Sequence, residues 1–286
     1  MRILISFILI FFTTVSFSQI NKPDSRPFVL GHIDEIQSFE LSEKRVLNIY
    51  LPDGYNSADT VTYPVVYLLD GSADEDFIHV VGLYQFNNFP WINRVPKSIV
   101  VGIANVDRKR DFTFPTTIRE DLKRVPTSGR SEKFIKFIEK ELQPYIEKKY
   151  KTSSSKTIIG QSLGGLLATE ILFKRPMLFD KYIIISPSNW WDNGSLLKVE
   201  PEILKKTNTT CAAVYIGVGK EGLAPTEIPH VMEVEANLLA EKIGNGNNKN
   251  LTLYFDYLPQ EDHATITHQA VFNALRLLYP VITKIK

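Results

Sequence analysis

A serine lies between two glycines in the segment Gly160-Gln161-Ser162-Leu163-Gly164, which has the pattern G-x-S-x-G. The segment follows an apolar run at 157–159 and precedes a helix-forming run at 163–173. A sharp turn between a strand and a helix lifts a serine hydroxyl free of both elements, where it can act as a nucleophile. The glycines remove side chains that would collide where the helix returns against the strand. An ordinary strand-to-helix turn is the alternative, and the flanking apolar runs favour the nucleophile.

A serine nucleophile needs a base, and in strand–turn–helix sites the partners follow in the order serine, acid, histidine. The chain has five histidines: His32, His79, His230, His263 and His268. The first two precede the serine, and His230 and His268 lie at the start of one predicted helix and inside another. His263 lies on the loop between the last predicted strand and the last helix. Loops at the carboxyl ends of parallel strands meet at one edge of a sheet, so Ser162 and His263 can converge. A solvated loop histidine or a helix cap is the alternative.

The acid should follow the strand before the one that leads to His263. Glu221 comes directly after the apolar segment 212–218 and could fix the imidazole tautomer and stabilise the imidazolium. An exposed loop glutamate is the alternative. Asp192, after the preceding strand, is the main rival for the acid, followed by Glu227 and Asp262.

An attacked carbonyl also needs hydrogen-bond donors for its oxyanion. The backbone N–H of Leu163, the residue after the serine, is one candidate. The second should come from the loop Asp70-Gly71-Ser72, after an early central strand. Gly71 permits a close approach of the backbone, so the N–H of Ser72 is the expected donor.

Strands and helices alternate along most of the chain, which predicts an α/β fold with a mostly parallel central sheet and helices on both faces. The predicted strands are 63–69, 98–104, 157–159, 182–185, 212–218 and 251–258, and the predicted helices are 132–150, 163–173, 231–243 and 265–278. Ser131 is the expected N-cap of the first helix. Segments 28–41 and 46–51, joined by a turn at Ser42-Glu43-Lys44, predict an antiparallel hairpin at the amino-terminal edge. The irregular tract 105–130 is long enough to be functional or mobile.

The composition is that of an ordinary globular protein. The 286 residues carry a formal net charge of +1, so there is no basic excess that would indicate a nucleic-acid partner or a membrane surface. The first 18 residues hold one basic residue, Arg2, an apolar run at 3–12 and small residues at 16 and 18. We interpret 1–18 as a signal peptide, with an uncleaved membrane anchor as the alternative. Residues 19–286 should then form a single exported domain, because no linker marks a second one.

Cys211 is the only cysteine, so an internal disulfide is excluded. Its apolar neighbours predict a buried thiol on a strand. No clustered histidine and cysteine spacing indicates a structural zinc ion, and no metal or other cofactor is expected.

The chain resembles the "putative esterase" branch of the α/β-hydrolases, which includes esterase D, siderophore esterases, feruloyl and acetyl-xylan esterases and mycolyl-transferase antigens. The resemblance covers nearly the whole mature chain, through the segments 50–55, 66–71, 105–113, 160–165, 186–191 and 262–264. It implies an α/β-hydrolase fold, with Ser162 and His263 in the positions of the nucleophile and base. The acid varies more within this family, and Glu221 matches its usual place.

Loops decide the substrate in such a family, and three features bear on it. Arg108 and Arg110 lie in the long loop near the expected site and could hold a carboxylate or catecholate, or could pair within their own cluster. Trp190 and Trp191 could wall an aromatic or sugar-bearing substrate, or could pack in the core. An apolar lining from Phe86, Phe89, Trp91, Phe112 and Phe114 is a further possibility, with ordinary core as its alternative.

We therefore expect an exported serine hydrolase that cleaves a small-molecule or glycan-linked carboxylic ester, in the manner of a siderophore esterase or a general carboxylesterase. A carbohydrate esterase that removes feruloyl or acetyl groups is the alternative. An acyltransferase and an inactive binding protein on the same fold are further alternatives.

Overall fold

The computed structural model describes residues 25–280. Residues 25–30 have no regular secondary structure, and every described helix and strand belongs to one compact unit that begins at Gly31. The predicted signal peptide, 1–18, lies outside the described residues. Across residues 25–280, no helix is both long and apolar enough to cross a membrane.

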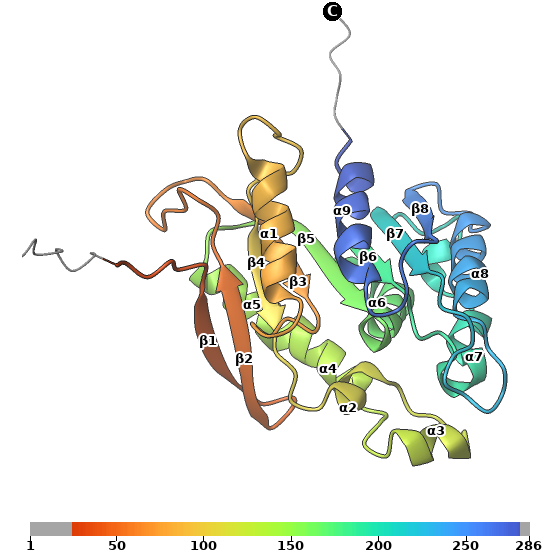
Figure 1. The fold of residues 1–286 in the computed structure, drawn as a ribbon. Helices are drawn as coiled ribbons and strands as arrows, with labels where there is room; N and C mark the ends of the chain where they lie inside the picture. Colours follow the sequence, from red (N-terminus) through yellow and green to blue (C-terminus); the bar gives the residue numbers. More distant parts are fainter. Residues whose placement is uncertain (1–24, 281–286) are drawn as a thin grey trace, which may run out of the picture. The chain divides into compact units, whose positions relative to one another are not determined.

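An eight-stranded sheet forms the centre of the unit (Figure 1). Its strands, in spatial order, are β1 (His32–Ser38), β2 (Glu43–Tyr50), β4 (Ile99–Ile103), β3 (Tyr63–Leu68), β5 (Thr152–Gln161), β6 (Lys181–Ile185), β7 (Ala212–Gly219) and β8 (Leu251–Leu258). β2 pairs antiparallel with β1 and β4, and all other neighbours are parallel. The predicted mostly parallel sheet with an antiparallel edge hairpin is confirmed.

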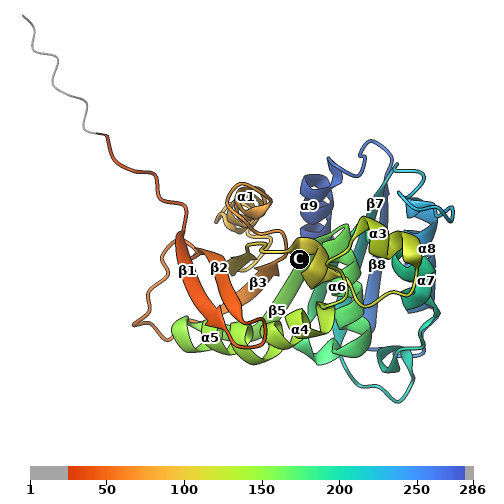
Figure 2. The same ribbon diagram turned by 90° about the horizontal axis from the view of Figure 1, so that it is seen from below.

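Helices cover both faces of the sheet, which explains why its central strands are apolar throughout. Figure 2 shows α1 (Phe77–Asn88) and α9 (Ile266–Leu278) on one face, and α4 (Ser131–Phe137), α5 (Gln143–Lys149) and α6 (Leu163–Lys174) on the other. α8 (Met232–Gly244) packs against β7 and β8. All five residues of β4 are buried, as the continuous apolar run predicts.

The edge hairpin turns earlier than predicted. Its turn spans 39–42, and Glu43 and Lys44 already belong to β2. The carboxylate of Glu141 explains the difference, because it accepts hydrogen bonds from the Ser38 hydroxyl and from the N–H groups of Phe39 and Glu40. This contact ends β1 at Ser38. A side chain from a helix a hundred residues away therefore sets the turn, and local turn chemistry could not reveal it.

The helices differ from the predictions in three places. The predicted helix 132–150 is interrupted by one π-helical turn at Ile138–Leu142 and begins at Ser131 itself, so Ser131 is not its cap. The irregular tract 105–130 contains two short helices, α2 (Arg108–Phe112) and α3 (Arg119–Arg124). Helices α1 and α7 (Trp191–Lys198) were not predicted. Their apolar residues do not follow the 3.6-residue period strongly enough to be distinguished from buried loop.

The prediction of a buried thiol at Cys211 is wrong. Cys211 is exposed, one residue before β7 begins. Burial starts at the next residue, Ala212, where the strand enters the sheet.

Candidate active site

The turn between β5 and α6 carries Ser162 in a strained backbone conformation. Its φ of 60° and ψ of −120° fall where residues other than glycine are rarely found. At Gly160 a side-chain Cβ would lie 2.4 Å from the carbonyl oxygen of Gly164. The chain therefore has glycine where the helix returns against the strand, as the sequence pattern predicted.

Ser162, His263 and Glu221 form a continuous row of hydrogen bonds. Nε2 of His263 lies 3.0 Å from Oγ of Ser162, and Nδ1 of His263 lies 2.6 Å from Oε2 of Glu221. The three residues follow β5, β8 and β7, whose carboxyl ends share one edge of the sheet. This topology joins side chains that are far apart in the sequence.

Glu221 and His263 have different surroundings. The side chain of Glu221 is 2% exposed, whereas that of His263 is 45% exposed. Burial opposes ionisation of Glu221, but hydrogen bonds from His263, Ser186 and the Gly219 N–H outweigh it and lower the pKa of the carboxyl. Glu221 is therefore a carboxylate at neutral pH. It can hold His263 with Nδ1 protonated and Nε2 free to accept a proton from Ser162.

The rival acids have other partners. The carboxylate of Asp192 accepts a hydrogen bond from Thr116, and its backbone N–H donates to Asp121. The carboxylate of Asp262 accepts from the N–H groups of Ala264 and Thr265, so it shapes the loop that carries His263. Among residues 25–280, Glu227 makes no hydrogen bond or ion pair with His263.

The two expected oxyanion donors are available. In the described part of the chain, the backbone N–H groups of Leu163 and Ser72 have no intramolecular acceptor. Close packing inside the protein, however, explains the glycine at position 71. A Cβ there would lie 2.4 Å from Cα of Gly102, so Gly71 lets the loop after β3 pack closely against β4.

Arg108 lies beside the nucleophile turn. Its Nε and Nη2 donate to the carboxylate of Asp70 at 2.6 and 2.9 Å, and Nη2 also lies 3.2 Å from the carbonyl oxygen of Gln161. The side chain is 30% exposed, and Nη1 has no partner within residues 25–280. Arg108 can therefore still meet a substrate anion.

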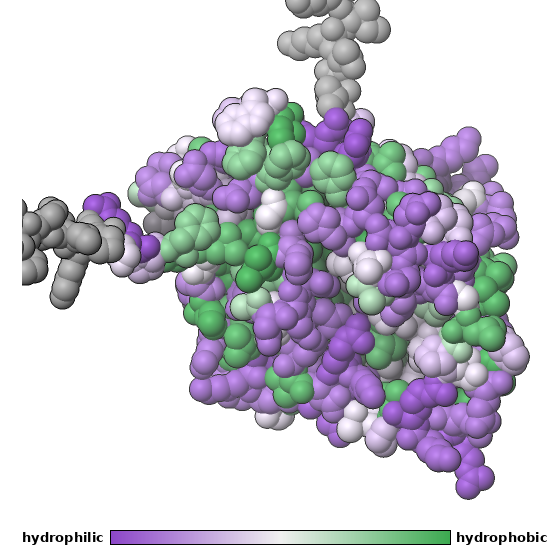
Figure 3. All heavy atoms as spheres, viewed as in Figure 1, coloured by the Kyte–Doolittle hydropathy of each residue, from purple (hydrophilic) through white to green (hydrophobic). Residues whose placement is uncertain are grey.

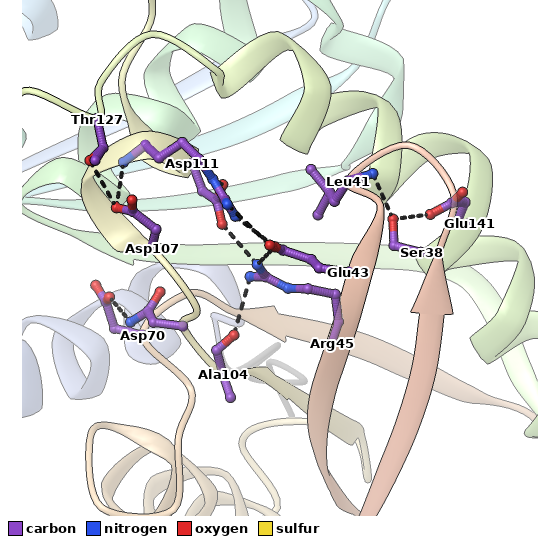
Figure 4. Close-up of polar contacts among 12 residues, drawn as sticks. Ser38, Leu41, Glu43, Arg45, Asp70, Ala104, Asp107, Asp111, Thr127 and Glu141 are labelled. Carbon is purple, nitrogen blue, oxygen red and sulfur yellow. Dashed lines mark hydrogen bonds and ion pairs between the residues drawn. The ribbon is translucent and has the colours of Figure 1, made fainter.

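The guanidinium group of Arg110 is not free to bind a substrate. Each of its three guanidinium nitrogens donates to a carboxylate, either Asp111 or Glu43. These carboxylates also bind Arg45, which is fully buried (Figure 4). The cluster joins α2 to β2, so we assign Arg110 a structural role and correct the prediction of substrate binding.

The two tryptophans do not form an exposed wall. Trp191 is fully buried, and its indole N–H donates to the carbonyl oxygen of Phe114 at 2.9 Å. Trp190 is 7% exposed and packs edge-on against Trp191. The predicted substrate role of Trp191 is therefore replaced by core packing.

The five aromatic residues considered as an apolar lining separate into two groups. Phe112 and Phe114 are buried in the core. Phe89 instead contacts both Phe86 and Trp91, and Phe86 and Trp91 are exposed. Figure 3 shows hydrophobic residues gathered over α1, the helix that carries Phe86.

Three polar side chains near the row were not predicted from the sequence. The hydroxyl of Ser188 lies 3.3 Å from that of Ser162, the hydroxyl of Ser186 donates to Glu221, and Asp70 holds Arg108. Ser186 and Ser188 directly follow the predicted strand 182–185, at the same edge as the serine. That position after a central strand could have indicated from the sequence that both serines lie near the nucleophile. Within the described residues, no group of three or more His, Cys, Asp or Glu side chains could hold a metal ion.

The sheet topology and the strained serine turn define an α/β-hydrolase. The chain belongs to the "putative esterase" family, whose model matches residues 38–248. It is therefore an ester hydrolase.

Similar proteins include the ferri-bacillibactin esterase BesA of Bacillus subtilis, 29% identical over 84% of this chain and 87% of that protein. Among solved structures, the BES protein of Bacillus cereus is 29% identical with a TM-score of 0.75, and the match covers 94% of this chain and all of that one. An IroE-like serine hydrolase of Shewanella oneidensis is 29% identical with a TM-score of 0.74, over 87% of this chain and 80% of that one.

Proposed function

We propose that the protein hydrolyses carboxylic esters through an acyl-enzyme formed on Ser162. The observation that carries this proposal is the row of hydrogen bonds from Ser162 through His263 to Glu221. His263 accepts the serine proton at Nε2 while Oγ attacks the ester carbonyl, and Glu221 stabilises the imidazolium that results. The N–H groups of Leu163 and Ser72 bind the oxyanion.

The same groups complete acylation and then carry out deacylation. His263 returns the proton to the leaving alcohol as the tetrahedral intermediate collapses to the acyl-enzyme. Water then attacks the acyl carbon while His263 takes a proton from it. The second tetrahedral intermediate collapses, His263 gives that proton to Oγ of Ser162 as the C–Oγ bond breaks, and the acid product is released. The half-exposed His263 leaves room for the entering water. No step needs a metal ion or other cofactor.

The proposed substrate is a small-molecule ester, of a siderophore or a related anionic compound. The similarity to BesA, an esterase of ferri-bacillibactin, supports this class. Arg108 supports it independently, because its partly exposed guanidinium lies beside the nucleophile turn and could bind a carboxylate or catecholate oxygen through Nη1. We also propose that 1–18 is a cleaved signal peptide and that 19–286 is a single exported domain.

A substrate panel with the purified mature chain tests the proposal. The panel contains short p-nitrophenyl esters, a ferric siderophore lactone, methyl ferulate and acetylated xylan, each assayed beside Ser162→Ala. We expect the lactone to have the highest kcat/KM and Ser162→Ala to lose nearly all turnover, on the order of 10⁶-fold in kcat. Fluorophosphonate should label the wild type on Ser162. Hydrolysis that persists in Ser162→Ala contradicts the mechanism, and a preference for methyl ferulate or xylan contradicts the substrate class.

A further inference from the structure

A short turn between β6 and α7 is bound directly to the nucleophile residue. The backbone N–H of Ser162 donates to the carbonyl oxygen of Ile185, and the N–H of Ser188 donates to the carbonyl oxygen of Ser162, both at 3.0 Å. The N–H of Ser186 donates to Gly217 on β7 at 2.8 Å. The turn therefore has a defined position relative to both the serine and the strand that leads to Glu221.

Ser186 directs its hydroxyl at the carboxylate of Glu221. The residue is fully buried, and its φ of 42° lies in the left-handed region that residues other than glycine rarely adopt. Its Oγ donates to Oε1 of Glu221, while Oε2 of the same carboxylate accepts from His263. A strained conformation of this kind persists only where the surroundings hold it in place, and such sites cluster at functional groups. Ser186 thereby fixes which carboxylate oxygen faces the histidine.

Ser188 directs its hydroxyl at the nucleophile itself. The residue is 1% exposed, and its Oγ lies 3.3 Å from Oγ of Ser162. Ser162 has one hydroxyl proton, and the contact with Nε2 of His263 at 3.0 Å uses it when the histidine is neutral. Ser188 must then be the donor to Oγ of Ser162. A donor at this place stabilises the negative charge that develops on Oγ as its proton leaves.

We propose that Ser186 is a positioning residue that acts through Glu221, and that Ser188 is a further catalytic residue that donates a hydrogen bond to Oγ of Ser162. This inference rests on the proposed function. During attack the Oγ–H bond of Ser162 breaks, the proton moves to Nε2 of His263, and Oγ forms the bond to the carbonyl carbon. The carbonyl electron pair moves onto its oxygen, and Ser188 keeps its own proton.

Double-mutant cycles on kcat, measured with p-nitrophenyl acetate, separate the two roles. We expect Ser186→Ala to lower kcat on the order of 100-fold, because Glu221 and His263 lose their orientation. Ser188→Ala should lower kcat about tenfold through the loss of one hydrogen bond, with KM unchanged. In a Glu221→Ala background, Ser186→Ala should cost less than about twofold more, since its acceptor is already absent. Ser188→Ala should keep its full effect there.

Ser98→Ala is the matched control. Ser98 is also 1% exposed, and its hydroxyl donates to the carbonyl oxygen of Pro96. It lies before β4, at the amino ends of the parallel strands, whereas Ser162 lies at their carboxyl ends. We expect unchanged kcat in this variant. Ser186→Gly provides a second test, because glycine accepts the left-handed backbone and should keep the urea midpoint of the wild type while kcat still falls.

Two results overturn the proposal by itself: an equal loss from Ser186→Ala in both backgrounds, or wild-type kcat in Ser188→Ala. Turnover that survives Ser162→Ala overturns the proposed function as well, so the two failures can be distinguished.

Discussion

The guanidinium group of Arg108 binds the carboxylate of Asp70 through two parallel hydrogen bonds, Nε to Oδ1 at 2.6 Å and Nη2 to Oδ2 at 2.9 Å. Asp70 begins the loop that presents the Ser72 N–H, and its φ of 53° is left-handed. Arg108 also contacts the carbonyl oxygen of Gln161, the residue before the nucleophile. One side chain from α2 thus joins the two backbone segments that would form the oxyanion site.

Arg108→Lys tests this connection. Lysine keeps the charge but cannot make the bidentate contact, so the Asp70 loop should lose its alignment with the serine turn. We expect kcat to fall about tenfold, which corresponds to one charge-assisted hydrogen bond. Steady-state kinetics with a neutral p-nitrophenyl ester measures the change in kcat. Lys109→Ala, a change at the exposed neighbouring residue, is the control and should leave kcat unchanged. A wild-type kcat in Arg108→Lys would show that the pair does not align the site.

The choice between Glu221 and Asp192 as the acid leads to a second prediction. Glu221→Ala should lower kcat roughly 10⁴-fold, because His263 loses the partner that fixes its tautomer. Asp192→Ala breaks only the contacts with Thr116 and Asp121 and should cost less than about tenfold. The kcat values of both variants, measured with the same ester, show which carboxylate is the acid. A larger loss in Asp192→Ala would reverse the assignment.

Asp76, at the start of α1, should make stability depend on pH. Burial, followed by the charge of Asp70, raises its pKa from 3.8 to about 6, and its side chain has no hydrogen-bond donor among the described residues. Because the folded state binds this proton more tightly than the unfolded state, the free energy of unfolding falls as the pH rises from about 4 to about 6.

Asp76→Asn removes that penalty. Allowing for partial exposure of the side chain, we expect the variant to be more stable than the wild type by roughly 1–2 kcal/mol at pH 7. The difference should disappear near pH 4, where the wild-type carboxyl is protonated. Urea unfolding at both pH values provides the measurement. A variant less stable than the wild type at pH 7 would mean that the charge favours the amino terminus of α1 more than burial opposes it.

The exposed Cys211 supplies a fourth prediction. A maleimide should react with the folded protein at one thiol per chain. Activity should be unchanged after labelling, because Cys211 precedes β7 and Ser162 follows β5, at opposite edges of the parallel sheet. Mass spectrometry and the ester assay report the two outcomes. Labelling only after denaturation would restore the original expectation of a buried thiol.

The sequence alone determined the mostly parallel sheet with its antiparallel edge hairpin, and the segments that meet at the catalytic edge. Apolar runs and turn residues are local signals, and the carboxyl ends of parallel strands must share an edge whatever the details of packing. The patterns around Ser162, Glu221 and His263 therefore sufficed to select three residues that the structure brings into hydrogen-bonding contact.

Only the tertiary structure decided what the neighbouring side chains contact. In the folded protein Trp191 is buried in the core, Arg110 forms ion pairs with Glu43 and Asp111, and Cys211 is exposed. It also placed the hydroxyls of Ser186 and Ser188 against the row. Each of these outcomes depends on the position and rotamer of a side chain from a distant segment. No local period or propensity carries that information, because burial and hydrogen bonding are settled between elements and not within them.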